Sequence, residues 1–259
     1  MPEIPLPPLE ALTAEVTTED SLLNGRLGLR QTTKGFRVAI DSVFLAAAVP
    51  ATAGDRVLEL GTGVGAAALC LAHRVPGCQI VGLERQPDIA RLAADNAVLN
   101  RLEDRIKIVV SDVCRTTGLR PASFDHVMAN PPHLDPKRGL PSPDQYRQAA
   151  KFEMAGGLSV WVDQCVNLVR PRGGITLIHR ADRLDELIAC LGGRTGGTVV
   201  FPLWPNGVAH VPAKRILVYT RRGVNARMSL AQGLTMHRSD GQFTTEAQAV
   251  LRDGQALVL

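Results

Sequence analysis

The sequence predicts an α/β fold: a doubly wound, mostly parallel seven-stranded sheet with an antiparallel edge strand and a short N-terminal extension. Two observations support it. Strand-like and helical segments alternate along most of the chain, which favours parallel strands with helices on both faces. The 259 residues, 45% of them hydrophobic, suffice for one large core. We expect an N-terminal arm, a small hairpin and a lid helix over residues 1–50, and the main domain over residues 51–259.

The predicted strands are short apolar runs bounded by turns. They are Arg56–Leu60, Gln79–Leu83, Ile106–Val110, His126–Ala129, Gly174–His179, Thr198–Phe201 and Arg215–Tyr219. Helical patterns lie at Ala66–His73, Pro87–Leu99, Gln145–Val169 and Arg183–Leu191. The last two strands are joined by Pro202–Pro212, which leaves no room for a helix, so we expect an antiparallel pair at one edge of the sheet.

The two ends of the chain carry smaller elements. Residues 26–40 contain loosely alternating apolar positions and glycines, which predict the two strands of a hairpin. Asp41 or Ser42 is a candidate N-cap for the following helix, which Pro50 ends. Near the C-terminus, Thr244–Glu246 is expected to begin a short helix.

Cysteine usage and hydropathy argue against several classes of protein. The five cysteines are scattered without a CxxC pair, and the histidines show no metal-ligand spacing, so we expect no metal. The first residues do not resemble a signal peptide, and no apolar run approaches the ~18 residues that span a bilayer. A cytoplasmic protein without a membrane partner is expected.

The basic residues are unevenly distributed, although the net charge is only +4. Four basic residues and no acid lie between Ser21 and Ile40, and seven basic residues and no acid between Ile188 and Ser239. Such segregation favours a polyanionic partner. On charge alone, an ordinary basic surface is an equal alternative.

A glycine-rich segment, VLELGTGVGAAAL, runs from Val57 to Leu69 and reads as strand, tight loop and helix start. Ligands bind at this edge of open α/β sheets, so the segment predicts a nucleotide-type cofactor. The spacing Gly61-x-Gly63-x-x-Ala66 fits a dinucleotide fingerprint, with Glu84 near the expected ribose. A loop for S-adenosylmethionine fits equally. A nicotinamide-dependent oxidoreductase therefore remains an alternative at this point.

The segment FDHVMANPPH places Asn130-Pro131-Pro132-His133 just beyond the fourth strand, at the same edge. The Asn130 side-chain carbonyl and the Pro131 backbone carbonyl could hold an amine whose lone pair is otherwise delocalised. The two prolines stiffen the loop, and the planar His133 ring could stack on a substrate. A plain rigid turn is the alternative. Tyr146 and Lys151 are five residues apart, which does not suit a short-chain dehydrogenase.

With these motifs the chain resembles class I S-adenosylmethionine-dependent methyltransferases of the small-domain type. It is most similar to the bacterial tRNA (adenine-N6)-methyltransferases that act beside the anticodon of valine tRNA. Besides the glycine loop and ANPPH, the resemblance covers Gly35–Pro50, Arg170–Leu184, Ala213–Gly223 and Asp240–Leu251.

The resemblance implies a Rossmann-like fold, S-adenosyl-L-methionine as cofactor and RNA, in particular tRNA, as partner. It implies catalytic roles for Asn130, Pro131, Pro132 and His133, although Tyr or Phe is more usual where this chain has His133. The implied cofactor-binding residues are Glu59, Gly61, Thr62, Gly63, Gly65, Glu84, Arg85, Asp112, Val113 and Asn130. The helix from Asp41 would lie over the cofactor.

We further expect Lys137, Arg138, Arg147 and Lys151 to form a phosphate-binding rim for the substrate. Three alternatives to tRNA adenine methylation remain. They are methylation of another RNA base or of a protein glutamine at N5, a nicotinamide-dependent oxidoreductase, and an RNA-binding module that has lost activity.

Overall fold

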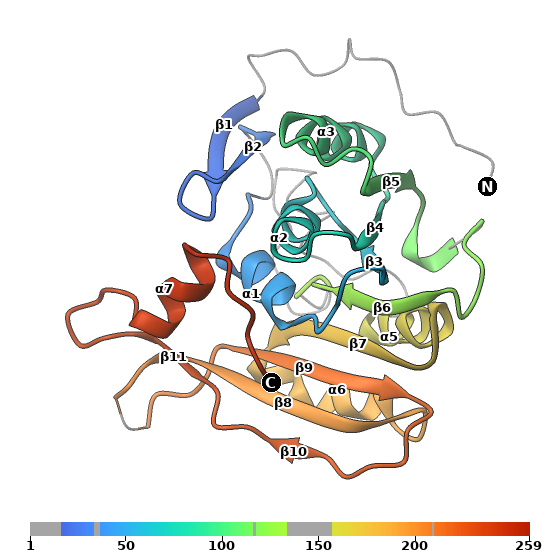
Figure 1. Ribbon diagram of the computed structural model, residues 1–259. Helices are drawn as coiled ribbons and strands as arrows, with labels where there is room; N and C mark the ends of the chain where they lie inside the picture. The colour runs from blue at the N-terminus through green and yellow to red at the C-terminus, as the bar shows by residue number, and fades with distance from the viewer. Residues whose placement is uncertain (1–16, 34–36, 116–117, 134–156, 209) are drawn as a thin grey trace.

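The computed structural model describes residues 17–33, 37–115, 118–133, 157–208 and 210–259. A twisted central sheet crosses the molecule in the order β10-β8-β9-β7-β6-β3-β4-β5, and β11 also pairs with β8 (Figure 1). The strands are β3 (Arg56–Leu60), β4 (Gln79–Glu84), β5 (Ile106–Val110), β6 (Phe124–Ala129), β7 (Val169–Arg180), β8 (Thr195–Asn206), β9 (Arg215–Arg222), β10 (Ser229–Leu230) and β11 (Leu234–His237).

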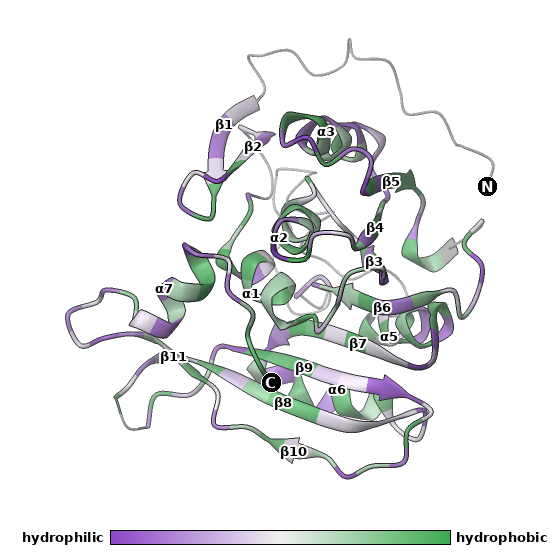
Figure 2. Cartoon of the chain, in the orientation of Figure 1, coloured by the Kyte–Doolittle hydropathy of each residue, from purple (hydrophilic) through white to green (hydrophobic). Residues whose placement is uncertain are grey.

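Helices pack on both faces of this sheet, as the alternating sequence pattern predicts. They are α1 (Ile40–Ala48), α2 (Ala66–Arg74), α3 (Pro87–Leu99), α5 (Gly157–Leu168), α6 (Leu184–Leu191) and α7 (Thr245–Leu251). One core cluster contains residues of α1, α2, α3 and α7, and the other contains residues of α5 and α6. Adjacent strand residues such as Val57 and Leu58 enter different clusters, which explains why the strands are apolar on both sides. In Figure 2, α1 is largely hydrophobic, and β9 ends in a hydrophilic stretch.

The α/β fold class is confirmed, but the place of the antiparallel strand differs from the prediction. β9 runs antiparallel to both β7 and β8 and lies between them, so it is not an edge strand. The segment expected to be only a connection, from Pro202, instead continues β8 as far as Asn206, where it pairs with β11. The short β10 and β11 bring the sheet to nine strands. They were missed because two to four residues show no readable alternation.

The N-terminal hairpin begins earlier than predicted. β1 (Thr17–Leu22) pairs with β2 (Leu27–Thr32) through a turn in which Leu23, Asn24 and Gly25 have positive φ. The prediction that both strands lie within residues 26–40 was wrong because β1, with the sequence TTEDSL, is mostly polar and shows no apolar alternation.

The N-terminal end of α1 differs from the prediction, whereas that of α7 agrees with it. Within the described residues no side chain caps α1, whose N-cap is Ala39, so neither Asp41 nor Ser42 has the predicted capping role. Thr244 caps α7 as expected, accepting from the Ala247 N–H at 3.2 Å. The predicted helix from Gln145 corresponds to α5 from Gly157 onward, and its earlier part lies outside the described residues.

The hairpin and α1 belong to the main hydrophobic core. Leu29 of β2 and Phe44 of α1 are buried in the same cluster as Leu69 of α2. This packing brings the N-terminal segment against the carboxyl edge of the sheet. Among the described residues, no helix has the length and apolar composition to cross a membrane.

Candidate active site

A cavity of about 380 Å³ lies at the carboxyl ends of β3, β4 and β6, where ligands bind in folds of this kind. The loops after these strands form its floor. Thr32, Val38 and Ser42, from β2, the segment before α1 and α1 itself, line its other side. The N-terminal segment therefore encloses the site from a part of the chain remote from the strands in sequence.

The glycine loop between β3 and α2 depends on backbone conformations that favour glycine. Gly61, Gly63 and Gly65 have φ values of 67°, 55° and 88°. A Cβ at Gly61 would lie 2.6 Å from Cη2 of Trp161 in α5, so the ring packs directly on this part of the loop. The Thr62 N–H donates to the Leu83 carbonyl at 2.9 Å and ties the loop to the end of β4.

Glu59 is a buried carboxyl group on β3, beneath the glycine loop, and it lines the cavity. Its Oε2 accepts from the Thr62 hydroxyl at 2.7 Å and from the Ala68 N–H at 3.1 Å. Burial raises the pKa of Glu59 to about 8 and outweighs these two hydrogen bonds. The carboxyl group thus braces the loop and can become an anion when a cation binds nearby.

Glu84 at the end of β4 joins the glycine loop to the next turn. Its Oε2 accepts from the Gly63 N–H at 3.0 Å and its Oε1 from the Gln86 N–H at 2.9 Å. Burial raises the pKa of Glu84, although these backbone hydrogen bonds oppose the shift. Asp112, after β5, lines the same cavity and accepts from the Cys114 N–H at 2.8 Å.

The Asn130-Pro131-Pro132 segment after β6 forms another wall of the cavity. The Asn130 Oδ1 is buried and has no hydrogen-bond partner among the described residues. An unpartnered buried acceptor is costly, so this oxygen has unused capacity to accept a donor from a ligand in the cavity.

His133 lies in a cluster of polar side chains that the sequence did not reveal. Its Nδ1 is 3.2 Å from Nδ1 of His179 in β7, and its Nε2 is 3.7 Å from Oδ2 of Asp41 in α1. Arg215, the first residue of β9, donates from Nε to the same Asp41 oxygen at 2.7 Å. Burial alone would raise the pKa of Asp41, but His133 and Arg215 together hold it below its usual value. Burial lowers the pKa of His179 to about 3, so this ring is neutral.

The structure brings most of the predicted site residues together. All the predicted catalytic residues line the cavity, and so do the predicted cofactor-binding residues except Gly65, which is the N-cap of α2. Lys137, Arg138, Arg147 and Lys151 lie outside the described residues. Sequence reasoning missed the lining residues Ser42, Gln86, Trp161, Arg180 and Arg215. They come from helices, turns and strand ends that show no local motif.

Several basic side chains of the two basic stretches form ion pairs in the described part of the chain. In the N-terminal stretch, Arg26, Arg30 and Arg37 pair with Asp253, Glu19 and Asp20. In the C-terminal stretch, Arg215 lies at the cavity edge, whereas Arg222 lies at the opposite end of β9. The expectation of a polyanionic partner from these stretches stays a prediction.

Residues 36–141 match the family model described as the methyltransferase small domain. This span contains both the glycine loop and the Asn130–His133 segment. This part of the chain is therefore similar to the methyltransferase small domain. No group of three or more metal-binding side chains occurs among the residues that the structure describes.

Two relatives of this chain carry the same name. A tRNA1(Val) (adenine(37)-N6)-methyltransferase of Porphyromonas gingivalis is 34% identical over 169 residues, which cover 62% of this chain and 66% of the relative. The chain thus spans just under two thirds of that relative. A protein of the same name from Proteus mirabilis is 27% identical, with 84% of this chain and 86% of the relative covered.

The fold of this chain also occurs in a solved structure. One described as a predicted O-methyltransferase, protein Atu636 from Agrobacterium tumefaciens, has a TM-score of 0.70 and 26% identity. The match covers 85% of this chain and 99% of that one. The similarity therefore includes the sheet around the cavity and is not confined to the glycine loop.

Proposed function

We propose that this protein transfers a methyl group from S-adenosylmethionine to N6 of an adenine in tRNA. The observation that carries the proposal is the buried, unpartnered Oδ1 of Asn130 in the wall of a cavity whose floor is a glycine loop. A cofactor loop and an amine acceptor in one cavity suit methyl transfer to nitrogen.

The residues present fit S-adenosylmethionine. Glu59 would lie near its ammonium group, Glu84 would accept from its ribose hydroxyls, and Asp112 would accept from its adenine amine. The glycine loop leaves space for close approach, since a Cβ at Gly63 would meet no described atom within 4 Å. When bound, this cofactor supplies a methyl group activated by its sulfonium.

The chain's own contribution at the reacting nitrogen is positioning. The N6 amine carries two hydrogens, and its lone pair is delocalised into the adenine ring. Asn130 Oδ1 would accept one hydrogen and the Pro131 carbonyl the other, turning the lone pair toward the methyl group. Because Pro131 and Pro132 have restricted φ, the acceptors are held in place before the substrate arrives.

The choice of tRNA rests on the names of the relatives, which are tRNA1(Val) (adenine(37)-N6)-methyltransferases. A base in folded RNA must leave its stack to enter a cavity of this kind. Lys137, Arg138, Arg147 and Lys151 remain our candidates for contacts to the RNA backbone, since they follow the Asn130–His133 segment in the chain.

The test uses the purified protein, methyl-labelled S-adenosylmethionine, and separate tRNA and protein fractions from a strain that lacks the enzyme. Label in N6-methyladenosine of tRNA is expected. Label in methylglutamine, or in another nucleoside, would overturn the adenine assignment while keeping amine methylation.

A variant connects this activity to the site. Asn130→Ala should lower kcat by about 100-fold, as removal of a single positioned hydrogen-bonding group does elsewhere. Its affinity for S-adenosylmethionine, measured by calorimetry, should change little. Asp163→Asn is the matched control, because Asp163 forms an ion pair with Arg194 and does not line the cavity.

A further inference from the structure

Both ring nitrogens of His133 point toward protein groups. Nδ1 lies 3.2 Å from Nδ1 of His179, and Nε2 lies 3.7 Å from Oδ2 of Asp41. His133 nevertheless lines the cavity. With its nitrogens directed to the protein, the imidazole offers the cavity mainly its carbon surface. This arrangement suits stacking against a flat base and does not suit accepting a proton from the substrate.

Asp41 reaches His133 from a distant part of the chain. It lies on α1, and Arg215 of β9 holds its Oδ2 at 2.7 Å. The Asp41 side chain is only 12% exposed, and it does not cap its own helix. Burying a carboxylate is costly, so Asp41 needs a compensating cation, which Arg215 supplies. Packing alone would be served better by an apolar side chain.

His179 completes the support from the other side. It is fully buried on β7, and its Nε2 has no partner among the described residues. The two histidine rings lie 5.1 Å apart between centroids, tilted by 52°. His133 is therefore held between a neutral ring and an ion pair, and neither support comes from its own loop.

We propose that Asp41 and Arg215 are positioning residues that fix the His133 ring as the planar wall against which the target adenine stacks. The inference rests on the proposed function, because it assigns this wall to the substrate base. A small, polar ring such as that of His133 requires an ion pair to fix its orientation. Asp41 of α1 and Arg215 of β9 thus contribute to the specificity for a flat base.

The test is a double-mutant cycle with Asp41→Asn and His133→Phe, assayed for kcat and KM with tRNA. Asp41→Asn alone should lower kcat/KM for tRNA by about 10-fold, less than the ~100-fold that a 1 Å misplacement can cost, because His179 still contacts the ring. Its dissociation constant for S-adenosylmethionine should stay within twofold. In the His133→Phe background, which needs no polar support, Asp41→Asn should have no further effect beyond twofold.

A second variant covers the case in which Asp41→Asn does not fold. Asp41→Glu keeps the carboxylate and should retain more activity than Asp41→Asn when His133 is present, but gain nothing in the His133→Phe background. Asp163→Asn, which breaks the Arg194 pair away from the cavity, is the control and should match the wild type.

The outcomes separate the two proposals. If the Asp41 variants lowered kcat/KM equally in both backgrounds, the positioning role would be overturned, because Asp41 would then act independently of His133. A wild-type enzyme that is inactive on tRNA would overturn the proposed function, and this inference with it. An active wild type with the interaction absent from the cycle overturns the inference alone.

Discussion

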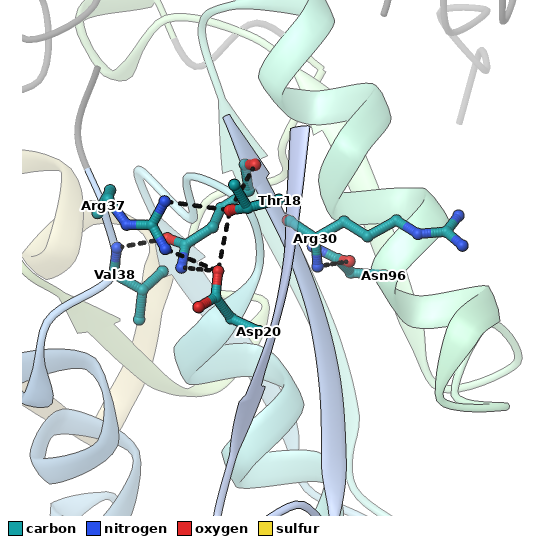
Figure 3. A network of polar contacts seen from close by, with 7 residues as sticks. Thr18, Asp20, Arg30, Arg37, Val38 and Asn96 are labelled. Atoms are coloured by element: carbon teal, nitrogen blue, oxygen red, sulfur yellow. Dashed lines mark hydrogen bonds and ion pairs between the residues drawn. The ribbon is translucent and has the colours of Figure 1, made fainter. Parts of the chain in front are cut away.

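Asn96 of α3 binds both backbone polar groups of Arg30 in β2. Its Oδ1 accepts from the Arg30 N–H at 2.8 Å, and its Nδ2 donates to the Arg30 carbonyl at 2.8 Å (Figure 3). The same Nδ2 donates to the Val64 carbonyl in the glycine loop at 2.9 Å. The fully buried carboxamide thus pairs with the hairpin as a neighbouring strand would and joins it to the cofactor loop. One turn later, Asn100 binds Gly28 in the same way.

Asn96→Ala should lower the free energy of unfolding by about 3 kcal/mol, because it removes three hydrogen bonds from a buried position at about 1 kcal/mol each. It should also weaken cofactor binding, since Val64 loses its tether. Denaturant unfolding and calorimetry measure the two effects. Asn100→Ala is the control and should destabilise the protein without weakening cofactor binding, because Asn100 has no such bond to the loop. A loss below about 0.5 kcal/mol for Asn96→Ala would contradict this account.

Gly61→Ala should abolish measurable cofactor binding, because its Cβ would lie 2.6 Å from the Trp161 ring and its φ is positive. Gly63→Ala adds a Cβ that meets no described atom within 4 Å, so it should lower the free energy of unfolding only by the backbone strain, about 1 kcal/mol. Thermal unfolding of both variants provides the comparison, and cofactor titration measures the loss of binding in Gly61→Ala. Equal losses of stability in the two variants would show that Trp161 does not restrict the loop.

The raised pKa of Glu59, about 8, predicts that cofactor binding releases a proton near pH 7. Burial favours the protonated carboxyl group, whereas a cofactor ammonium beside it would favour the carboxylate. Calorimetry in two buffers of different ionisation enthalpy counts the protons released. Glu59→Gln cannot ionise and should abolish this component. Proton release unchanged in Glu59→Gln would assign it to another group.

The same pKa also affects stability. Between the unfolded value of 4.5 and about 8, folded Glu59 keeps a proton that the unfolded chain has lost. The contribution of Glu59 to the free energy of unfolding is therefore full below pH 4.5, falls as the pH rises and levels off above pH 8. Urea unfolding from pH 5 to 8 should show a slope for wild type minus Glu59→Gln equivalent to about one proton. A difference that does not vary with pH would contradict the prediction.

Gln31 links the hairpin to the segment over the cavity; its partners Asp20 and Val38 are labelled in Figure 3. Its Oε1 accepts from the Val38 N–H at 2.9 Å, and its Nε2 donates to Asp20, which also pairs with Arg37. Since Val38 lines the cavity, Gln31→Ala should speed cofactor dissociation by roughly tenfold, the equivalent of about one hydrogen bond. Stopped-flow displacement measures the rate. Arg30→Gln, which breaks only the exposed pair with Glu19, should leave it unchanged.

Local sequence determined the parts of this protein in which neighbouring residues decide the structure. The apolar runs of β3, β4 and β5 matched their strands to within one residue, because a short apolar run bounded by turns is a local signal of a strand. The glycine spacing located the tight loop that lines the cavity, since positive φ at Gly61, Gly63 and Gly65 is a local requirement. Likewise, the two prolines of Asn130-Pro131-Pro132 predicted a rigid loop, because proline restricts φ.

Only the tertiary structure decided which distant residues complete the site. Asp41 and Arg215 are 174 residues apart in the chain, yet they meet at His133 because β9 inserts between β7 and β8 and α1 packs over the sheet edge. Trp161 of α5 likewise contacts Gly61, which is distant from it in the chain. A sequence motif records contacts between near neighbours. Contacts across the sheet depend on the strand order and helix packing that the whole chain selects by burying its apolar surface.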